Sequence, residues 1–248
     1  MSHRKQFVLL PGWSNHGDRM WRDLIEHLTP HYDVHTIVVS NQSNAAGMAR
    51  EVLQLAPPEF TLLGHSLGGL VAQHLALMAP QRVQRMVLVC TYPGNAPEAQ
   101  REFFRHGMLT PLLNGTIGQH WPQLNQSCVD PRRAGERDLL DALAACQQLP
   151  RAGLVNQTRV LINAWDISAR LTALSMPTLI LYGRQDQLFS MEMQRLMLSK
   201  LRRAELKVIE NCGHLPALER PQATREAILS WLAQSTPGED RRKDGQPA

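Results

Sequence analysis

The segment Phe60-Thr-Leu-Leu-Gly-His-Ser-Leu-Gly-Gly-Leu-Val-Ala72 decides the fold of this chain. Its first residues, Phe60 to Leu63, have the continuous apolar character of a strand in a parallel sheet. Residues Leu70 to Met78 are strongly helical in pattern. Between the two lies a G-x-S-x-G motif, Gly64 to Gly68. A sharp turn from strand to helix exposes Ser66, because the flanking glycines remove the Cβ atoms that would clash.

Strand-like and helix-like segments alternate on both sides of this motif. Short aliphatic and β-branched runs predict strands at 7–10, 34–39, 60–63, 86–89, 178–181 and 206–209. Apolar residues at three- and four-residue spacing predict helices at 20–28, 45–55 (capped by Asn44), 70–78, 191–201 and 224–232. The alternation predicts an α/β fold with a mostly parallel, twisted sheet and helices on both faces.

A long stretch between the fourth and fifth predicted strands, 95–173, contains no convincing strand. It has helical patches, such as 137–149, that are interrupted by prolines. We therefore expect a helical lid at 95–173, inserted into a core formed by 1–94 and 174–234. The tail 235–248 has no apolar residue larger than proline or alanine, which predicts disorder.

Composition excludes several classes of protein. The 248 residues are 43% hydrophobic and 19% charged, which is ordinary for a globular chain large enough to bury a core without staples. The 26 basic and 22 acidic residues give a net charge of +4, but no block of like charge stands out. Without a basic face or a binding motif, we do not expect a nucleic-acid partner.

Cellular location is indicated by two features of the sequence. The apolar run near the start, Phe7 to Leu10, is too short for a secretory signal or a membrane span. The four cysteines have no metal-binding spacing, which favours buried thiols in a reducing compartment. We therefore expect a cytoplasmic protein with no membrane partner. We infer no metal and no cofactor, because the chain has neither a ligand cluster nor a cofactor-binding glycine loop.

A serine nucleophile needs a base, and the base needs an acid to orient it. When the serine follows a strand in this way, the expected chain order is Ser, Asp or Glu, then His. Of the ten histidines, only His214 follows the last predicted strand, and Asp186 follows the fifth. The segment after the fourth strand, Thr91 to Gly94, has no carboxylate. The sequence predicts a catalytic triad of Ser66, Asp186 and His214, whose structural alternatives are a helix cap, a turn cap and a surface residue.

Two backbone amides are candidates for an oxyanion hole, which needs two hydrogen-bond donors. Leu67 begins the helix after Ser66, so its N–H has no partner within that helix. Trp13 lies in the loop Pro11 to Ser14 that follows the first strand. We predict that the N–H groups of Trp13 and Leu67 form the hole, while the Trp13 side chain is equally consistent with simple packing.

Four motifs make the chain resemble the serine α/β-hydrolase superfamily: LLPGW at 9–13, LLGHSLGGLVA at 62–72, PTLILYGRQDQL at 177–188 and ENCGHLPALERP at 210–221. The resemblance runs from Phe7 to about Ala233. Within the superfamily, the chain most resembles the compact bacterial branch, which includes carboxylesterases, enol-lactonases and the methyl esterase acting on pimeloyl-carrier protein. Two departures stand out. The usual His-Gly of the first loop is replaced by Pro11-Gly12, and the Asp-x-x-Gly-x-Gly-x-Ser loop of many relatives is replaced by Ser40-Asn-Gln-Ser-Asn44. The second departure argues against assigning this chain the substrate of the relatives that have that loop.

The resemblance implies a hydrolase that cleaves a carboxylic ester, lactone or thioester through an acyl-enzyme intermediate. One alternative is a C–C bond hydrolase or amidase with the same triad, and a non-enzymatic alternative is a ligand-binding receptor of the same fold. Dehalogenation is not expected, because that reaction needs a carboxylate in place of Ser66.

Substrate choice is expected to reside in the insertion at 95–173. Its larger apolar residues would either roof an acyl pocket or simply pack the insertion onto the core. The candidates singled out for this role are Phe103, Phe104, Met108, Leu109, Leu112, Leu113 and Trp121. Five of its arginines could meet an acidic carrier protein or a substrate carboxylate: Arg101, Arg105, Arg132, Arg133 and Arg137. Because glutamates are interleaved with them, we favour a solvated surface over a docking site for an acidic carrier protein. The expected partner is a small-molecule ester or acyl substrate.

Overall fold

The computed structural model describes residues 4–147 and 149–235. Six strands form one parallel sheet in the order β2-β1-β3-β4-β5-β6. The strands are β1 (Lys5–Leu10), β2 (Tyr32–Thr36), β3 (Phe60–His65), β4 (Val83–Val89), β5 (Thr178–Gly183) and β6 (Ala204–Ile209). Each predicted strand is present, so the predicted α/β fold with a parallel sheet is confirmed.

The second strand ends earlier than its sequence pattern predicts. The pattern extends over 34–39, whereas β2 ends at Thr36. Its only neighbour in the sheet, β1, ends before Pro11, which has no N–H to continue the ladder. Ile37 and Val39 remain buried, at 8% and 6% exposure. These two side chains therefore pack in the hydrophobic core beside the sheet, although their backbone is not part of a strand.

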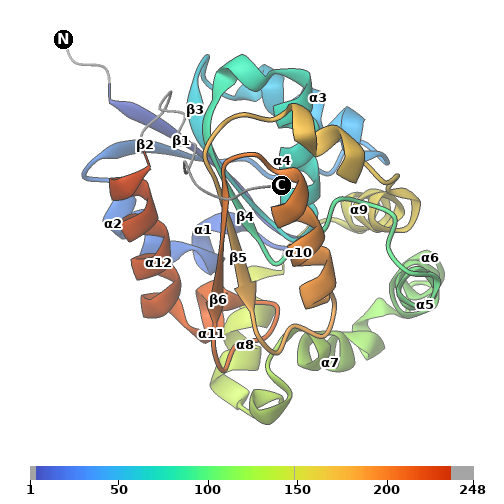
Figure 1. The fold of residues 1–248 in the computed structure, drawn as a ribbon. Coiled ribbons are helices and arrows are strands. Elements are labelled where there is room, and N and C mark those ends of the chain that lie inside the picture. The colour runs from blue at the N-terminus through green and yellow to red at the C-terminus, as the bar shows by residue number, and fades with distance from the viewer. Residues whose placement is uncertain (1–3, 148, 236–248) are drawn as a thin grey trace.

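Alternate residues of the strands contribute to different hydrophobic clusters. Phe7 and Leu9 of β1 belong to one cluster, and Val8 and Leu10 belong to the other. The first cluster includes residues of α1 (Gly17–Met20), α2 (Arg22–Leu28), α11 (Pro216–Glu219) and α12 (Pro221–Gln234). The second includes residues of α3 (Ala45–Leu55), α4 (Leu67–Met78) and α10 (Met191–Lys200). Helices therefore cover both faces of the sheet, as Figure 1 shows.

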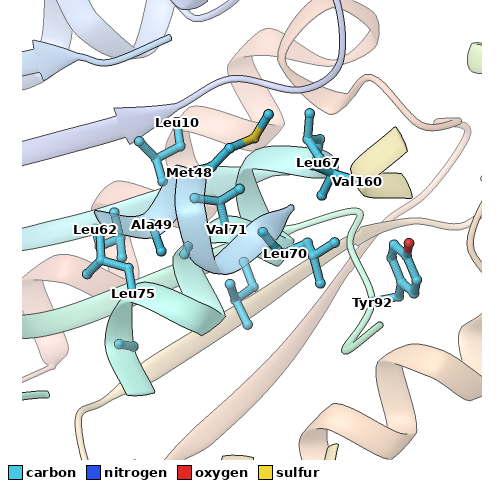
Figure 2. Close-up of a cluster of buried hydrophobic side chains, with 14 of the residues drawn as sticks. Leu10, Met48, Ala49, Leu62, Leu67, Leu70, Val71, Leu75, Tyr92 and Val160 are labelled. Atoms are coloured by element: carbon cyan, nitrogen blue, oxygen red, sulfur yellow. The ribbon is translucent and has the colours of Figure 1, made fainter. Parts of the chain in front are cut away.

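The second cluster joins α3 and α4 to the sheet. Figure 2 shows Met48 and Ala49 of α3 gathered with Val71 of α4 and with Leu10 and Leu62 of the strands. The predicted N-cap of α3 is confirmed, because the Asn44 side chain accepts a hydrogen bond from Gly47 N at 2.7 Å. The helix predicted over 20–28 is instead split at Trp21 into α1 and α2.

The described residues between β4 and β5 form helices and no strand. They are α5 (Glu98–Glu102), a π-helical segment (Phe103–Leu109), α6 (Thr110–Asn114), α7 (Ile117–Cys128), α8 (Arg137–Cys146) and α9 (Arg151–Asn163). Short 3-10 turns occur at Pro80–Arg82, Pro131–Arg133 and Ser168–Ala173. Figure 1 shows α7 and α8 at the bottom of the view and α5, α6 and α9 at the right. Pro122 lies inside α7 and does not interrupt it.

The C-terminal tail and a possible membrane-spanning helix are the last two features that the sequence raised. The predicted disorder of 235–248 falls outside the described residues except for Ser235. Within the described chain, no helix has both the length and the apolar character that a bilayer crossing demands.

The start of α4 approaches the end of β1 at very short range. A Cβ atom added to Gly68 would lie 2.2 Å from the carbonyl oxygen of Leu10, and one added to Gly64 would lie 2.4 Å from the oxygen of Gly68. Both neighbours are backbone atoms, which cannot move aside as a flexible side chain can. Only glycine at these two positions therefore allows α4 to begin immediately after Ser66.

We expect Gly68→Ala to lower the free energy of unfolding by about 1–3 kcal/mol or more, because overpacking displaces backbone. Gly118→Ala is the matched control, since an added Cβ at this exposed position of α7 meets nothing within 4 Å. The control should raise the free energy of unfolding by up to about 1 kcal/mol, because alanine favours the helix. Urea unfolding followed by circular dichroism measures both, and an unchanged Gly68→Ala midpoint would contradict the close contact.

Candidate active site

Ser66 occupies the turn between β3 and α4 in an unusual backbone conformation. Its φ of 53° and ψ of −118° are strained for a residue with a side chain. Two contacts with the end of β4 hold the turn. Ser66 N donates to Val89 O at 2.9 Å, and Thr91 Oγ1 donates to Ser66 O at 2.7 Å. The fold thus maintains the strained turn that the motif predicts.

Leu67 follows Ser66 directly, and the loop that contains Trp13 lies close to Ser66, since a Cβ on Gly12 would be 3.3 Å from Ser66 Cβ. In the part of the chain that the structure describes, neither backbone N–H donates a hydrogen bond to another element. The Trp13 side chain is well held, because its ring lies 5.2 Å from that of Trp121 and its Nε1 donates to Thr158 Oγ1 at 2.9 Å. Trp13 therefore has the packing role that the sequence left open. The oxyanion role of the two amides stays a prediction.

His214 and Asp186 are brought together as predicted. The distance between His214 Nδ1 and Asp186 Oδ2 is 2.9 Å, with the two side chains only 4% and 0% exposed. The other carboxylate oxygen accepts the N–H groups of Leu188 and Phe189 at 2.8 and 3.2 Å. The acid is thereby fixed in the orientation that holds the imidazole. No hydrogen bond joins Ser66 to His214 among the described residues, and such contacts often tighten only when substrate binds.

A cavity opens beside these residues, and both Ser66 and His214 line it. Most of its wall is apolar. Of the insertion residues expected to roof such a pocket, Phe103, Phe104 and Met108 line it. Leu112 is instead buried in packing between helices, and Leu113 is 50% exposed. The cavity also has apolar residues that the sequence did not single out: Leu124, Leu143, Leu161, Leu188, Phe189 and Leu215.

Comparison with known proteins agrees with this geometry. Residues 5–221 match the family model described as alpha/beta hydrolase fold. The chain belongs to the alpha/beta hydrolase fold family. The resemblance expected from the four motifs is therefore confirmed over most of the chain.

Relatives of this hydrolase include named esterases. It is 30% identical to a pimeloyl-[acyl-carrier protein] methyl ester esterase from Vibrio campbellii, over 87% of this chain and 90% of the relative. It is 29% identical to one from Cronobacter sakazakii, over 91% and 92% of the two chains. The solved structure of a hydrolase from Pseudomonas aeruginosa has a TM-score of 0.81 at 25% identity, covering 94% of this chain and 91% of that one.

Glu219 holds the loop that presents the hydrolase's histidine. Its buried carboxylate accepts the N–H groups of Gly213 and Leu215, the two neighbours of His214, at 2.9 and 3.2 Å. It also accepts the N–H of Asp130, in the insertion, at 2.8 Å. Sequence reasoning missed this residue, whose only signal is its place shortly after His214. Glu219 therefore positions the loop through backbone hydrogen bonds.

Cys90 lies beside the acid and the base. The sulfur of Cys90, an oxygen of Asp186 and a nitrogen of His214 all lie within 4.8 Å of one another. Three such atoms are close enough together to bind a metal ion. Two of the three groups, however, are already hydrogen-bonded to each other, since His214 pairs with Asp186. Burial, followed by the charge of Asp186, raises the pKa of the Cys90 thiol well above its usual value. The protonated thiol is therefore the favoured form.

His65, next to Ser66, is buried in its neutral form. Its Nε2 donates to the backbone oxygen of His214 at 2.9 Å, so Nδ1 is the unprotonated nitrogen and has no partner among the described residues. Burial, and then the proximity of His214, lowers the pKa of His65 to about 3. His65 therefore supports the histidine loop without carrying a charge.

The low pKa of His65 predicts a specific acid sensitivity. The unfolded chain binds a proton at His65 below its ordinary pKa of 6.5, whereas the native state does so only near pH 3. The stability associated with neutral His65 is fully present above pH 6.5 and is lost as the pH falls toward 3, at up to about 1.4 kcal/mol per pH unit. Urea unfolding at a series of pH values across this window gives the slope of the free energy of unfolding against pH. In His65→Gln this slope should be smaller than in the wild type by the equivalent of about one bound proton. The exposed His31→Gln is the control, and equal slopes in all three proteins would contradict the assignment.

Four of the five arginines singled out in the insertion are paired with nearby carboxylates. Arg101 pairs with Glu98, and Arg105 pairs with both Glu98 and Glu102. Arg132 and Arg133 pair with Asp130 and Glu136, each at 2.6 Å. These pairs fit the solvated-surface interpretation that the sequence favoured.

Proposed function

We propose that this hydrolase cleaves a carboxylic ester by transferring its acyl group to Ser66. One observation carries the proposal: His214, held by a 2.9 Å hydrogen bond to Asp186, lines the same cavity as Ser66. A serine on a strained turn, a histidine and a carboxylate that orients it are the groups that acyl transfer needs. The esterase names of the relatives favour an ester over the carbon–carbon or amide bonds that the same triad can cleave.

In the first half of the proposed reaction, Ser66 Oγ attacks the ester carbonyl while His214 Nε2 takes its proton. Asp186 holds the imidazole in the required tautomer and stabilises its charged form. The N–H groups of Trp13 and Leu67 bind the oxygen that becomes negative in the tetrahedral intermediate. His214 then gives the proton to the departing alcohol. In the second half, His214 activates water, which releases the acid and restores Ser66.

We also infer that the insertion at 95–173 acts as a lid over the core formed by 1–94 and 174–234. Phe103, Phe104 and Met108 contribute an apolar part of the cavity wall. Apolar walls exclude water and strengthen the electrostatic interactions of the triad. A cytoplasmic location belongs to the same proposal and is supported by the four free cysteines.

Ser66→Ala is expected to lower kcat by a factor on the order of 10⁴–10⁶, because the nucleophile is lost while the binding cavity remains. Hydrolysis of p-nitrophenyl butyrate measures this, and labelling of intact protein by a fluorophosphonate probe should disappear in parallel. Ser199→Ala, at an exposed position of α10, is the matched control and should keep full activity. Retention of hydrolysis by Ser66→Ala would rule out the proposed nucleophile.

The relatives suggest a finer substrate for this chain: a methyl ester on an acyl chain attached to acyl-carrier protein. If the carrier contributes to binding, kcat/KM for the carrier-bound ester should exceed that for the free methyl ester by about tenfold or more, equivalent to about 1.4 kcal/mol. Excess carrier protein without an acyl group should then inhibit the reaction competitively. Equal values for the two substrates would remove the carrier from the proposal and leave ester hydrolysis by Ser66 intact.

A further inference from the structure

One stretch of the cavity wall is polar although its surroundings are apolar. It comprises Ser14 and Asn15 from the loop after β1, Asn125 of α7 and Gln147, which follows α8. Backbone contacts bring two of these segments together. His16 N donates to Cys146 O at 2.8 Å, and Asn15 pairs with Gln147 in an antiparallel bridge. Neutral polar side chains that are remote in sequence therefore converge on one part of the cavity.

The amide group of Asn15 is held in a single orientation. Its Nδ2 donates to the backbone oxygen of Trp13 at 2.9 Å, so the opposite atom, Oδ1, is an acceptor. Asn15 is only 5% exposed, and Oδ1 has no hydrogen-bond partner among the described residues. Buried acceptors are nearly always paired in folded proteins. An unpaired acceptor in a cavity wall therefore points to a donor supplied by a ligand.

Ser14 provides a second unpaired oxygen next to it. Its side chain is buried, and Oγ has no partner among the described residues. The backbone of Ser14 has a φ of 65°, in the left-handed region that residues other than glycine rarely adopt. Ser14 N donates to Gln157 Oε1 at 2.9 Å, which helps to hold this conformation. Strain of this kind is typical of residues whose position matters for binding.

The lack of charged side chains in the described part of the cavity wall limits which ligand groups can bind next to Asn15. Among the described residues, no lysine, arginine, aspartate or glutamate lines the cavity. A carboxylate placed against Asn15 Oδ1 would be desolvated, would meet an acceptor and would have no counter-charge. An ammonium group would also lack a counter-charge. A hydroxyl or an amide N–H can donate to Oδ1 without burying a charge.

We propose that Ser14, Asn15, Asn125 and Gln147 form a subsite that selects esters carrying a neutral hydrogen-bond donor, either a hydroxyl or an amide N–H. The donor lies on the part of the substrate that occupies the cavity. Gln147 Nε2 donates to Asn125 Oδ1 at 2.7 Å, which fixes these two amides before a ligand arrives. The proposal rests on the proposed function, because the subsite positions an ester for attack by Ser66.

The test is a panel of methyl esters of graded chain length, measured with the full-length wild-type protein. At each length the ω-hydroxy ester and the ω-carboxamide ester are compared with the plain alkanoate of equal size and with the ionised ω-carboxylate. At the best length, kcat/KM for a neutral-donor ester should exceed that of the alkanoate by about 3- to 10-fold, the effect of one added hydrogen bond. The ionised ester should be the poorest substrate.

Variants at Asn15 assign the preference to its oxygen. Asn15→Leu, which has a similar volume and no acceptor, should bring the ratio of hydroxy ester to alkanoate close to one. Asn15→Asp should instead favour ω-ammonium esters. The alkanoate rate of each variant serves as its internal reference. Asn114→Leu, at the exposed end of α6, is the matched control and should keep the wild-type ratio.

The wild-type panel decides the proposal even if the variants fold poorly. A wild-type protein that hydrolyses alkanoate or carboxylate esters as fast as the neutral-donor esters overturns the subsite and leaves the proposed function standing. Retention of the wild-type ratio by Asn15→Leu overturns it as well. Failure to hydrolyse any ester in the panel overturns the proposed function itself.

Discussion

The contact between the first turn of α4 and the last residue of β1 is the constraint on which the candidate site depends. Because Gly68 has no Cβ, its backbone can lie against the carbonyl group of Leu10. That contact allows the helix to start directly after Ser66 and brings the loop containing Trp13 alongside. Ser66, the candidate nucleophile, and both candidate oxyanion donors are therefore placed by backbone packing, which is more rigid than placement by side chains.

The other half of the site depends on the neighbouring strands β5 and β6. Their carboxyl ends carry the loops of Asp186 and His214, and a Cβ on Gly183 would lie 1.9 Å from Gly213 O. Gln185 joins the loops further, since its N–H donates to Cys212 O and its side chain accepts from Cys212 N, both at 2.8 Å. Asp186 and His214, the proposed acid and base, are thus positioned as one unit, and Glu219 supports the His214 loop through backbone hydrogen bonds.

Sequence patterns predict the parts of the molecule that are determined locally. Strand periodicity, the G-x-S-x-G motif and the order Ser66, Asp186, His214 lead to the sheet and to the juxtaposition of acid and base, because parallel strands present their carboxyl ends at one edge. The cavity wall is different. Leu112 and Leu113 look alike in sequence, yet one is buried and the other is half exposed. The place of Asn15 in the polar part of the cavity wall depends on its contact with Gln147, which follows α8. No local sequence pattern predicts that contact.

The histidine loop is hydrogen-bonded to the insertion as well as to the core. His214 N donates to Cys128 O at 2.9 Å, and the Asp130 N–H binds the same Glu219 that supports His214. Residues 128–130 are thus a fixed point of the insertion, and any displacement of them would disturb the base. Because α7 ends at Cys128, a displacement of this helix would be transmitted to the backbone of His214.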